Sequence, residues 1–248
     1  MLTSVLHNIG VKNILRIVLV IFLCVIFPFE SFSQEQKLQN RPYIDLRPFH
    51  YGFMIGAHNS SLDIQNSGYI DPVTNEQWFA ENSQFDTGFT VGLLGEWRLN
   101  SNFGVRILPT LHFATRHITF REQATNRKEF QEIRSTFVSL PIDIKFTPPR
   151  CNNYRPYFIV GVNGMYDLTT KKQDYLQMKP LTFMFEVGFG CDYYLPYFKF
   201  IPEIKYCFGL NNSVEKDRKA LVDKSLEKYT KAISSGITNM IVLTFYFE

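Results

Sequence analysis

The chain has 248 residues, of which 45% are hydrophobic, 16% are aromatic and 20% are charged. This composition excludes a disordered chain, and the 24 phenylalanines and 13 tyrosines favour a strand-rich protein because aromatic rings pack well on a pleated surface. A net charge of +3 is too small to indicate a nucleic-acid partner.

The first 33 residues are predicted to be a cleavable signal peptide. Lys12 and Arg16 supply its positive charge, and residues 17–29 form an apolar run of about 13 residues. Ser31 and Ser33 are the small residues that precede a cut before residue 34. A helical anchor, the weaker alternative, would need about 20 apolar residues. Residues 34–48 are then expected to form an extended periplasmic segment, and residues 49–248 the main domain.

Apolar and polar residues alternate with a period of two in eight segments of this domain, which predicts eight strands. Several segments reach about 10 residues, the length at which a tilted strand crosses a bilayer. Strands of soluble proteins average nearer 5 or 6 residues. The eight segments lie around residues 51–57, 89–98, 103–116, 138–146, 157–166, 183–192, 200–208 and 241–247.

One face of these segments keeps charged side chains, where a soluble sandwich would have an apolar face. Apolar residues outside and polar residues inside are typical of membrane barrels, and such a sheet must close because lipid leaves no partner for an open edge. An eight-stranded barrel is only wide enough for side chains, so we expect paired charges and no channel. The charged residues are Glu96, Arg98, Arg106, Asp143, Lys145, Glu186, Asp192, Glu203 and Lys205.

The connections between the segments alternate in length, which supports an antiparallel barrel with long extracellular loops and short periplasmic turns. Long connections are expected at residues 58–84, 115–132, 167–180 and 211–235, and short ones at 99–102, 148–153 and 195–197. The last long connection includes Val214–Ile233, which fits a short surface helix and a charged loop equally well.

Outer-membrane barrels can be enzymes, so each ionisable residue inside the predicted barrel is a candidate catalyst. His112 is predicted to face the lumen near Arg106 and Glu96, where it could act as a general base. A histidine held by neighbouring charges is the stronger interpretation, because no serine or aspartate in a triad-like context accompanies it. The sequence also has no zinc-binding spacing and no phosphate-binding loop. We therefore predict no catalytic, cofactor-binding or metal-binding residues.

Aromatic residues cluster near the predicted strand ends and are expected to form a girdle at the membrane interface rather than a ligand cage. They are Trp97, Tyr193, Tyr194, Tyr197 and Phe198.

Signal cleavage would leave three cysteines, Cys151, Cys191 and Cys207. The last two lie on neighbouring predicted strands but point to opposite faces by parity, so no disulfide is expected between them.

Several stretches resemble a known family. The run from Gly88 to Arg106, the run Ser139–Phe146 and the dipeptide Gly161-Val162 resemble the small outer-membrane barrels of Bacteroidetes. Residues 41–45 (RPYID) and 49–53 (FHYGF) resemble the start of PorT-like proteins within that family. The similarity covers nearly the whole mature chain. Barrels of this kind usually end on an aromatic residue, so Glu248 after Phe247 is a departure that we expect to be tolerated.

This resemblance implies a non-enzymatic part of the type IX (Por) secretion system, in the cell outer membrane. That system exports proteases and other cargo with C-terminal sorting domains, so the implied partners are outer-membrane lipid and other secretion proteins. The alternatives are a stand-alone adhesin or surface-binding barrel that uses its long loops, and an enzyme working at the lumen mouth. Neither the partner nor the contact surface is indicated by the sequence.

Overall fold

The computed structural model describes residues 38, 40–72, 75–81, 86–169, 175–216 and 226–248. The predicted signal peptide lies outside these residues. Within them, no helix has both the length and the apolar character needed to span a bilayer.

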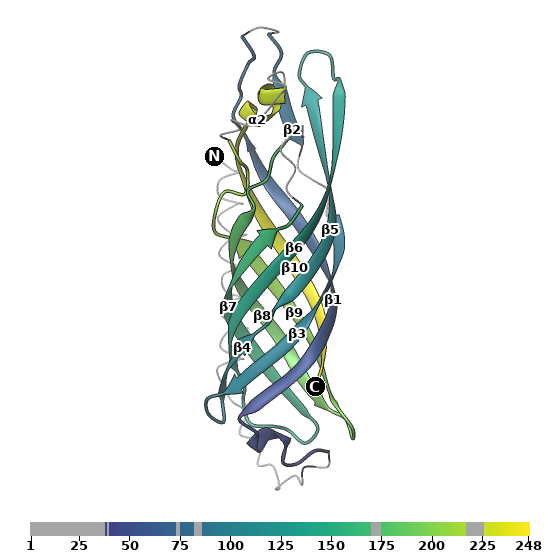
Figure 1. The fold of residues 1–248 in the computed structure, drawn as a ribbon, viewed down its shortest axis with the longest axis vertical. Helices are drawn as coiled ribbons and strands as arrows, with labels where there is room; N and C mark the ends of the chain where they lie inside the picture. The colour runs from purple at the N-terminus through teal and green to yellow at the C-terminus, as the bar shows by residue number, and fades with distance from the viewer. Residues whose placement is uncertain (1–37, 39, 73–74, 82–85, 170–174, 217–225) are drawn as a thin grey trace, which may run out of the picture. The chain divides into compact units, whose positions relative to one another are not determined.

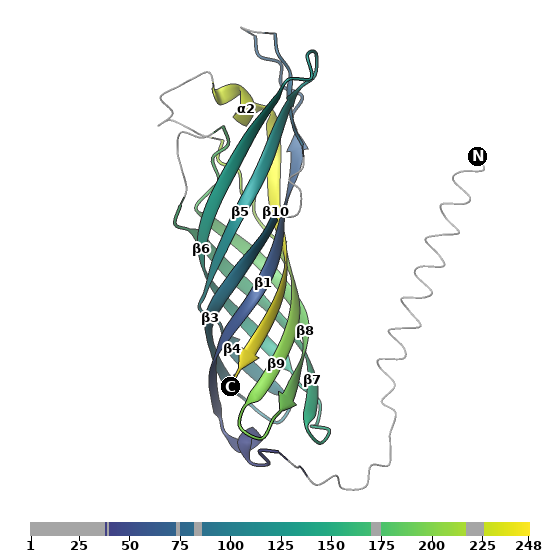
Figure 2. The same ribbon diagram turned by 90° about the vertical axis from the view of Figure 1, so that its right-hand side faces the viewer.

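Ten strands and two short helices make up the described part of the chain (Figures 1 and 2). The strands are β1 (Phe49–Asn66), β2 (Trp78–Glu81), β3 (Asp86–Arg98), β4 (Phe103–Ile107), β5 (Thr110–Glu122), β6 (Lys128–Phe146), β7 (Tyr154–Asp167), β8 (Leu181–Tyr194), β9 (Lys199–Gly209) and β10 (Ile233–Phe247). The helices are η1 (Ile44–Leu46) and α2 (Glu227–Lys231).

The strands form an antiparallel ring. Pairing runs in order from β1 to β3, to β4 and β5, and then through β6, β7, β8 and β9 to β10. β10 pairs with β1 from Phe53–Phe247 to Asn66–Ile233, so the ring returns to its first strand. The predicted all-β antiparallel fold is confirmed.

β4 and β5 together are the third predicted strand, interrupted at Leu108 and Pro109. Proline has no amide hydrogen and cannot donate to a ladder, but its carbonyl still accepts from Leu93 N at 3.0 Å. With β4 and β5 taken as one interrupted strand, the ring has the eight strands predicted. β2 is an addition, paired with β5 above the ring.

Three predicted long connections are partly strand, which corrects the prediction. β1 continues to Asn66, β5 and β6 form a hairpin that extends to Glu122 and Lys128, and β10 begins at Ile233. This hairpin projects beyond the ring (Figures 1 and 2). Strands that leave the bilayer face water on their outer side, so they lose the apolar-out pattern on which the prediction depended.

The connections at the other end are short, as predicted. They cover residues 99–102, 147–153 and 195–198. We call this the short-turn end; it also carries Glu248, the last residue, and η1. The opposite end, with the β5–β6 hairpin, β2 and α2, is called the hairpin end. Of the helix considered for residues 214–233, only α2 is present among the described residues.

The outer surface of the ring is apolar and the strand parity is as predicted. Phe89, Leu93 and Trp97 of β3 are exposed, while Thr90 and Glu96 are buried inside. β6 repeats this arrangement, with Leu140, Ile142 and Ile144 outside and Asp143 and Lys145 inside. A continuous outward apolar surface of this kind is suited to lipid.

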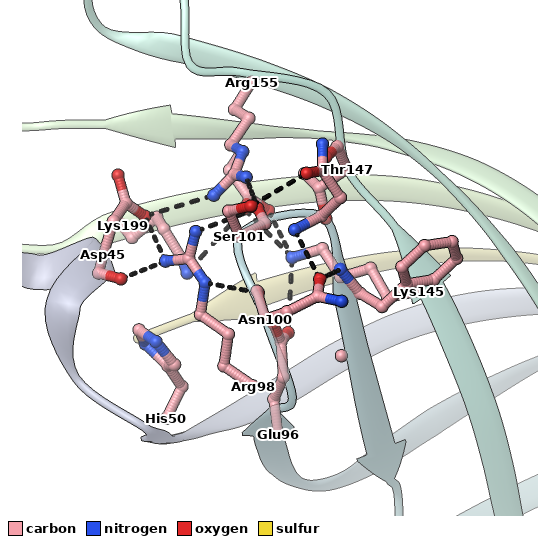
Figure 3. Close-up of a pocket in the computed structure, with 14 residues that line it drawn as sticks. Asp45, His50, Glu96, Arg98, Asn100, Ser101, Lys145, Thr147, Arg155 and Lys199 are labelled. Atoms are coloured by element: carbon pink, nitrogen blue, oxygen red, sulfur yellow. Dashed lines mark hydrogen bonds and ion pairs between the residues drawn. The ribbon is translucent and has the colours of Figure 1, made fainter.

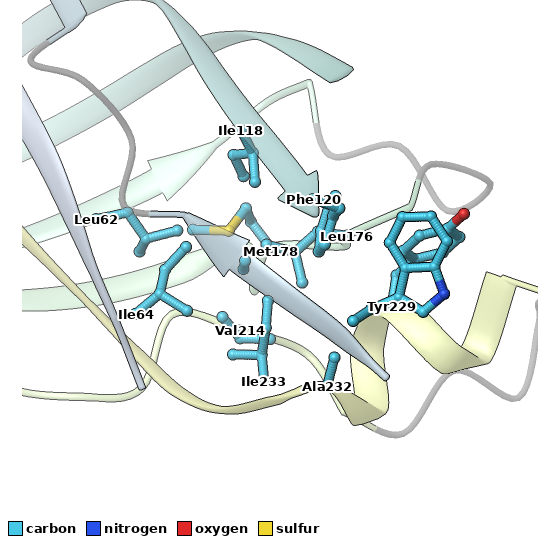
Figure 4. Packing of buried hydrophobic residues seen from close by; sticks show 12 residues of the cluster. Leu62, Ile64, Ile118, Phe120, Leu176, Met178, Val214, Tyr229, Ala232 and Ile233 are labelled. Carbon is cyan, nitrogen blue, oxygen red and sulfur yellow. The ribbon is translucent and has the colours of Figure 1, made fainter. Parts of the chain in front are cut away.

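The hairpin end is closed by a buried apolar cluster, which we call the cap (Figure 4). β1, β2, β5, α2 and β10 contribute to it, together with the connections before β8 and before β10. Trp78 and Tyr229 pack edge to face with ring centroids 4.9 Å apart, and Phe120 lies 5.1 Å from Tyr229. The cap residues are Leu62, Ile64, Trp78, Ala80, Ile118, Phe120, Leu176, Met178, Val214, Tyr229, Ala232 and Ile233.

Candidate functional site

The interior of the short-turn end is a network of ion pairs that begins at Asp45. This carboxylate lies 3.5 Å from both Arg98 and Arg155 and 3.4 Å from Arg150. The Tyr194 hydroxyl donates to it at 2.8 Å. Asp45 belongs to η1, so these contacts hold the segment before β1 against the end of the ring (Figure 3).

Further inside, acids and bases from four strands alternate. The Lys145 ammonium donates to Glu96 at 3.2 Å and to Asp192 at 3.0 Å. Lys199 lies between Asp192 and Glu248 and pairs with both carboxylates. These side chains fill the mouth of the ring, where the remaining cavity has a volume of about 10 Å³, room for a single water.

Arg106 occupies the centre of the network and is fully buried. Its guanidinium donates to Glu96 at 3.1 Å and to Glu203 at 2.5 Å. It also lies 5.0 Å from the Tyr157 ring and 4.9 Å from the Tyr246 ring, within range of cation–π attraction. Both tyrosine hydroxyls donate to Glu203. One cation is therefore enclosed by two acids and two aromatic rings.

Lys205 forms the next group. Its ammonium lies 3.2 Å from Asp143 and from Glu186, and 3.7 Å from Glu203. The pairing of lumen carboxylates with lumen bases that the sequence led us to expect is thus present in the described residues. A lone charge in this environment would be costly, and Lys145, Lys199, Arg106 and Lys205 each have a carboxylate partner.

Glycines on the ring wall make room for these large side chains. A Cβ at Gly190 would overlap the Tyr157 hydroxyl, and one at Gly161 would overlap the Asp143 carboxylate. The side chains of Tyr157 and Asp143 therefore have room because the residue paired with each on the neighbouring strand is glycine.

Apolar residues line the interior between the ion pairs. Met54, Leu94 and Ile201 pack around Tyr157 and Tyr246, and Met165, Met184 and Cys207 form a separate buried cluster. With the ion pairs at one end and the cap at the other, the described residues leave no continuous opening. This agrees with the expectation of a filled lumen.

His112 faces the interior, as predicted, but its neighbours differ from those expected. Its Nε2 lies 2.9 Å from the Ser139 hydroxyl and 3.2 Å from the Thr110 hydroxyl, and its ring meets His58 edge to face at 5.1 Å. Arg106 and Glu96, the expected neighbours, bind each other instead. His112 and Ser139 are both buried, at 4% and 1% exposed.

Several interior residues were not predicted from the sequence. Tyr194 was placed in the interface girdle but is buried inside, because it shares the inward parity of Asp192. The other girdle residues, Trp97, Tyr193, Tyr197 and Phe198, are exposed. Other residues join the interior network although the sequence did not predict them there: Asp45, His50, Arg155, Tyr157, Lys199, Tyr246 and Glu248. Those of them that lie in strands could have been identified because their positions alternate with outward-facing residues.

Glu248 has a structural role rather than being merely tolerated. Its backbone exchanges two hydrogen bonds with Lys199, at 2.8 and 3.0 Å, and its carboxylate lies 2.5 Å from His50 Nδ1. Burial alone would raise the pKa of this carboxyl, but Lys199 and His50 outweigh it and lower the pKa to about 2. Without Glu248, His50 would lose this carboxylate partner and Lys199 would keep Asp192.

The low pKa of Glu248 predicts a pH-dependent contribution to stability. A folded pKa of about 2 against an ordinary 4.5 means that the contribution is complete above pH 4.5 and is lost as the pH falls towards 2. Glu248→Gln should thus be less stable than wild type at pH 7, and the difference should shrink below pH 4.5. Denaturant midpoints of both proteins between pH 7 and 3 measure this. A difference that stays constant would contradict the assignment.

Among the described residues, no group of three or more His, Cys, Asp or Glu side chains could hold a metal ion. The filled lumen and the apolar outer surface together are those of a membrane-embedded β-barrel. A sequence family described as "Outer membrane protein beta-barrel domain" matches residues 32–215. The chain belongs to this family and is located in the outer membrane.

Three solved structures are similar to the chain at low identity. The outer membrane protein OprG from Pseudomonas aeruginosa is 14% identical, over 80% of this chain and 91% of its own, with a TM-score of 0.34. Ail, the attachment invasion locus protein of Yersinia pestis, is 12% identical, over 79% of this chain and 96% of its own, with a TM-score of 0.33. The structure of Ail in complex with the heparin analogue sucrose octasulfate is 14% identical, over 79% of this chain and 96% of its own, with a TM-score of 0.32. No curated protein matches the chain.

The three cysteines provide a test of orientation. They are free, with Cys151 exposed in the 147–153 connection, and Cys191 and Cys207 on opposite faces. Because short turns of such barrels face the periplasm, a membrane-impermeant maleimide should label Cys151 only after the outer membrane is permeabilised. Cys207 should stay unlabelled until the protein is unfolded. Labelling of Cys151 on intact cells would reverse the orientation.

Proposed function

We propose that this barrel is a non-enzymatic component of a type IX secretion system, which acts by presenting surfaces to partner proteins. The observation that carries the proposal is the filled lumen: a barrel with no passage cannot serve as the export conduit. Its contribution must come from its ends. The likeness of residues 41–45 and 49–53 to PorT-like proteins supports this particular system.

The short-turn end offers the surface that suits a periplasmic partner. Tyr43 and Leu46 of the segment around η1 are each 77% exposed, and Tyr197 is 91% exposed. Asp45, between the first two, is tied to three arginines. An ordered segment loses less entropy when it binds than a flexible one. This end therefore presents exposed apolar side chains on a fixed backbone.

Deleting the gene and following the surface delivery of secreted proteases tests the proposal. We expect delivery to fail and to return with the wild-type gene. Unaffected delivery would refute the role in secretion. Photo-crosslinkers placed at Tyr197 and at Phe130, one at each end of the barrel, would then identify the contact. A secretion-system protein should be captured through Tyr197.

A stand-alone surface-binding barrel is the second candidate, favoured by the packed cap and by the β5–β6 hairpin. Phe130 on this hairpin is 72% exposed. On this reading, removing the barrel would leave protease delivery intact and abolish attachment to a surface. For either role we propose no catalysis, and His112→Ala, made in a folded barrel, should leave the phenotype unchanged.

A further inference from the structure

A groove on the outside of the barrel lies where the apolar surface ends. It crosses β3, β5 and β6 and has a volume of about 460 Å³. The strand register gives the order of the residues that line it. Phe89 pairs with Phe113, and Phe113 with Thr136, in one row across the three strands. Two residues nearer the hairpin end, Thr115 pairs with Arg134.

The row nearer the barrel centre is suited to an acyl chain. The rings of Phe89 and Phe113 stack with centroids 4.7 Å apart and planes inclined by 19°. Phe89 is 55% exposed. Both rings continue the apolar outer surface of β3 and β5, and they form the last aromatic pair on these two strands before the polar row.

The row nearer the hairpin end is suited to an anionic headgroup. Arg134 has a side chain that is 81% exposed, and it pairs with Glu132 at 2.9 Å. Glu132 is itself 48% exposed, and pairs this open to solvent contribute little stability. The guanidinium can therefore exchange this partner for a phosphate, which it can bind through two parallel hydrogen bonds.

The backbone beneath Arg134 is fixed by Thr169. Its hydroxyl accepts from Thr136 N at 3.0 Å and donates to the Arg134 carbonyl at 3.1 Å. Thr169 also donates to Asp167 through its backbone amide. β6 is thereby held where β7 no longer pairs with it. The backbone position of Arg134 relative to the two rings is thus set by the fold.

We propose that this groove binds a phosphorylated glycolipid of the outer leaflet, with an acyl chain on Phe89 and Phe113 and a phosphate on Arg134. The amphipathic order of the two rows matches that of such a lipid. Long connections of such barrels face the cell exterior; with the hairpin end outside, the groove lies at the level of the outer-leaflet headgroups. This inference is independent of the role in secretion, because it concerns a different surface of the barrel.

Native mass spectrometry of the folded barrel in detergent tests the proposal, with bisphosphorylated and dephosphorylated lipid A as probes. A single basic residue near a lipid surface accounts for about a fivefold difference in binding. We therefore expect wild type to retain the phosphorylated lipid about fivefold better. Arg134→Ala should lose this preference. Glu132→Gln, which frees Arg134, should strengthen it.

Arg127→Ala is the matched control. It removes the same charge from the turn of the same hairpin, where Arg127 is 63% exposed and pairs with Glu129. It should retain the lipid preference. Equal retention by the Arg134 and Arg127 variants, or equal binding of the two lipids by wild type, would overturn the proposal. So would displacement of the lipid by inorganic phosphate, which would indicate a simple anion site. Heat-dependent gel migration confirms that each variant is folded.

Discussion

Arg106→Ala is expected to destabilise the barrel by about 3–5 kcal/mol, the cost of removing one partner from a buried ion pair. Arg106 is fully buried and is shared by Glu96 and Glu203. After its removal, Glu203 keeps two tyrosine hydroxyls and a distant Lys205, while Glu96 keeps Lys145. Urea unfolding of the barrel in vesicles measures the loss.

A second variant separates charge from packing. Arg106→Met combined with Glu203→Gln removes a cation and an anion together, so no buried charge loses its only strong partner. Replacing a whole buried pair by neutral residues is often close to neutral for stability. We expect the double variant to recover most of the loss. If it were as unstable as Arg106→Ala, the guanidinium would act through its packing between Tyr157 and Tyr246 and not through its charge.

An exposed arginine, Arg127, provides the comparison for the stability effect of Arg106→Ala. Arg127→Ala also removes one cation, but its side chain is 63% exposed, and substitutions at such positions usually change stability by less than about 0.5 kcal/mol. An equal loss for both arginines would refute the view that the interior network stabilises the ring.

The sequence predicted the ring well because lipid enforces a strict alternation on membrane-spanning strands. Phe89, Leu93 and Trp97 could be placed outside, and Glu96 inside, from parity alone. Parity also placed the side chains of Cys191 and Cys207 on opposite faces of the sheet. What it could not provide was the partner of each charge, because Arg106 reaches across the lumen to Glu203 on a strand far along the chain.

The regions outside the bilayer were harder to predict. β1 beyond His58 and the β5–β6 hairpin face water, so most of their outer residues are polar and the pattern resembles a loop. Tyr194 was misplaced because aromatic residues near strand ends were assigned by residue type instead of by parity. Asp45 precedes the first strand, and no periodicity marks it as the residue that joins three arginines.

The second large effect is expected in the cap, an extensive apolar cluster at the hairpin end. Phe120→Ala should destabilise the cap by about 3–5 kcal/mol, the usual cost of truncating a buried phenylalanine. Phe120 is fully buried and packs on Tyr229, while Phe130 on the partner strand of the hairpin is 72% exposed. Phe130→Ala is therefore the matched control and should have little effect.

Limited proteolysis of whole cells measures this effect from the outside. Since the ring is held by its own ladders and ion pairs, Phe120→Ala should open the cap while the ring stays folded. We expect faster cleavage in residues 123–127, the turn between β5 and β6, with a membrane-protected fragment that includes β7 to β9. If Phe120→Ala unfolded the whole barrel, the cap and the ring would be one cooperative unit. If it left cleavage unchanged, the apolar cluster would not be what holds the hairpin, and the case for a packed outer surface that binds a partner would fail with it.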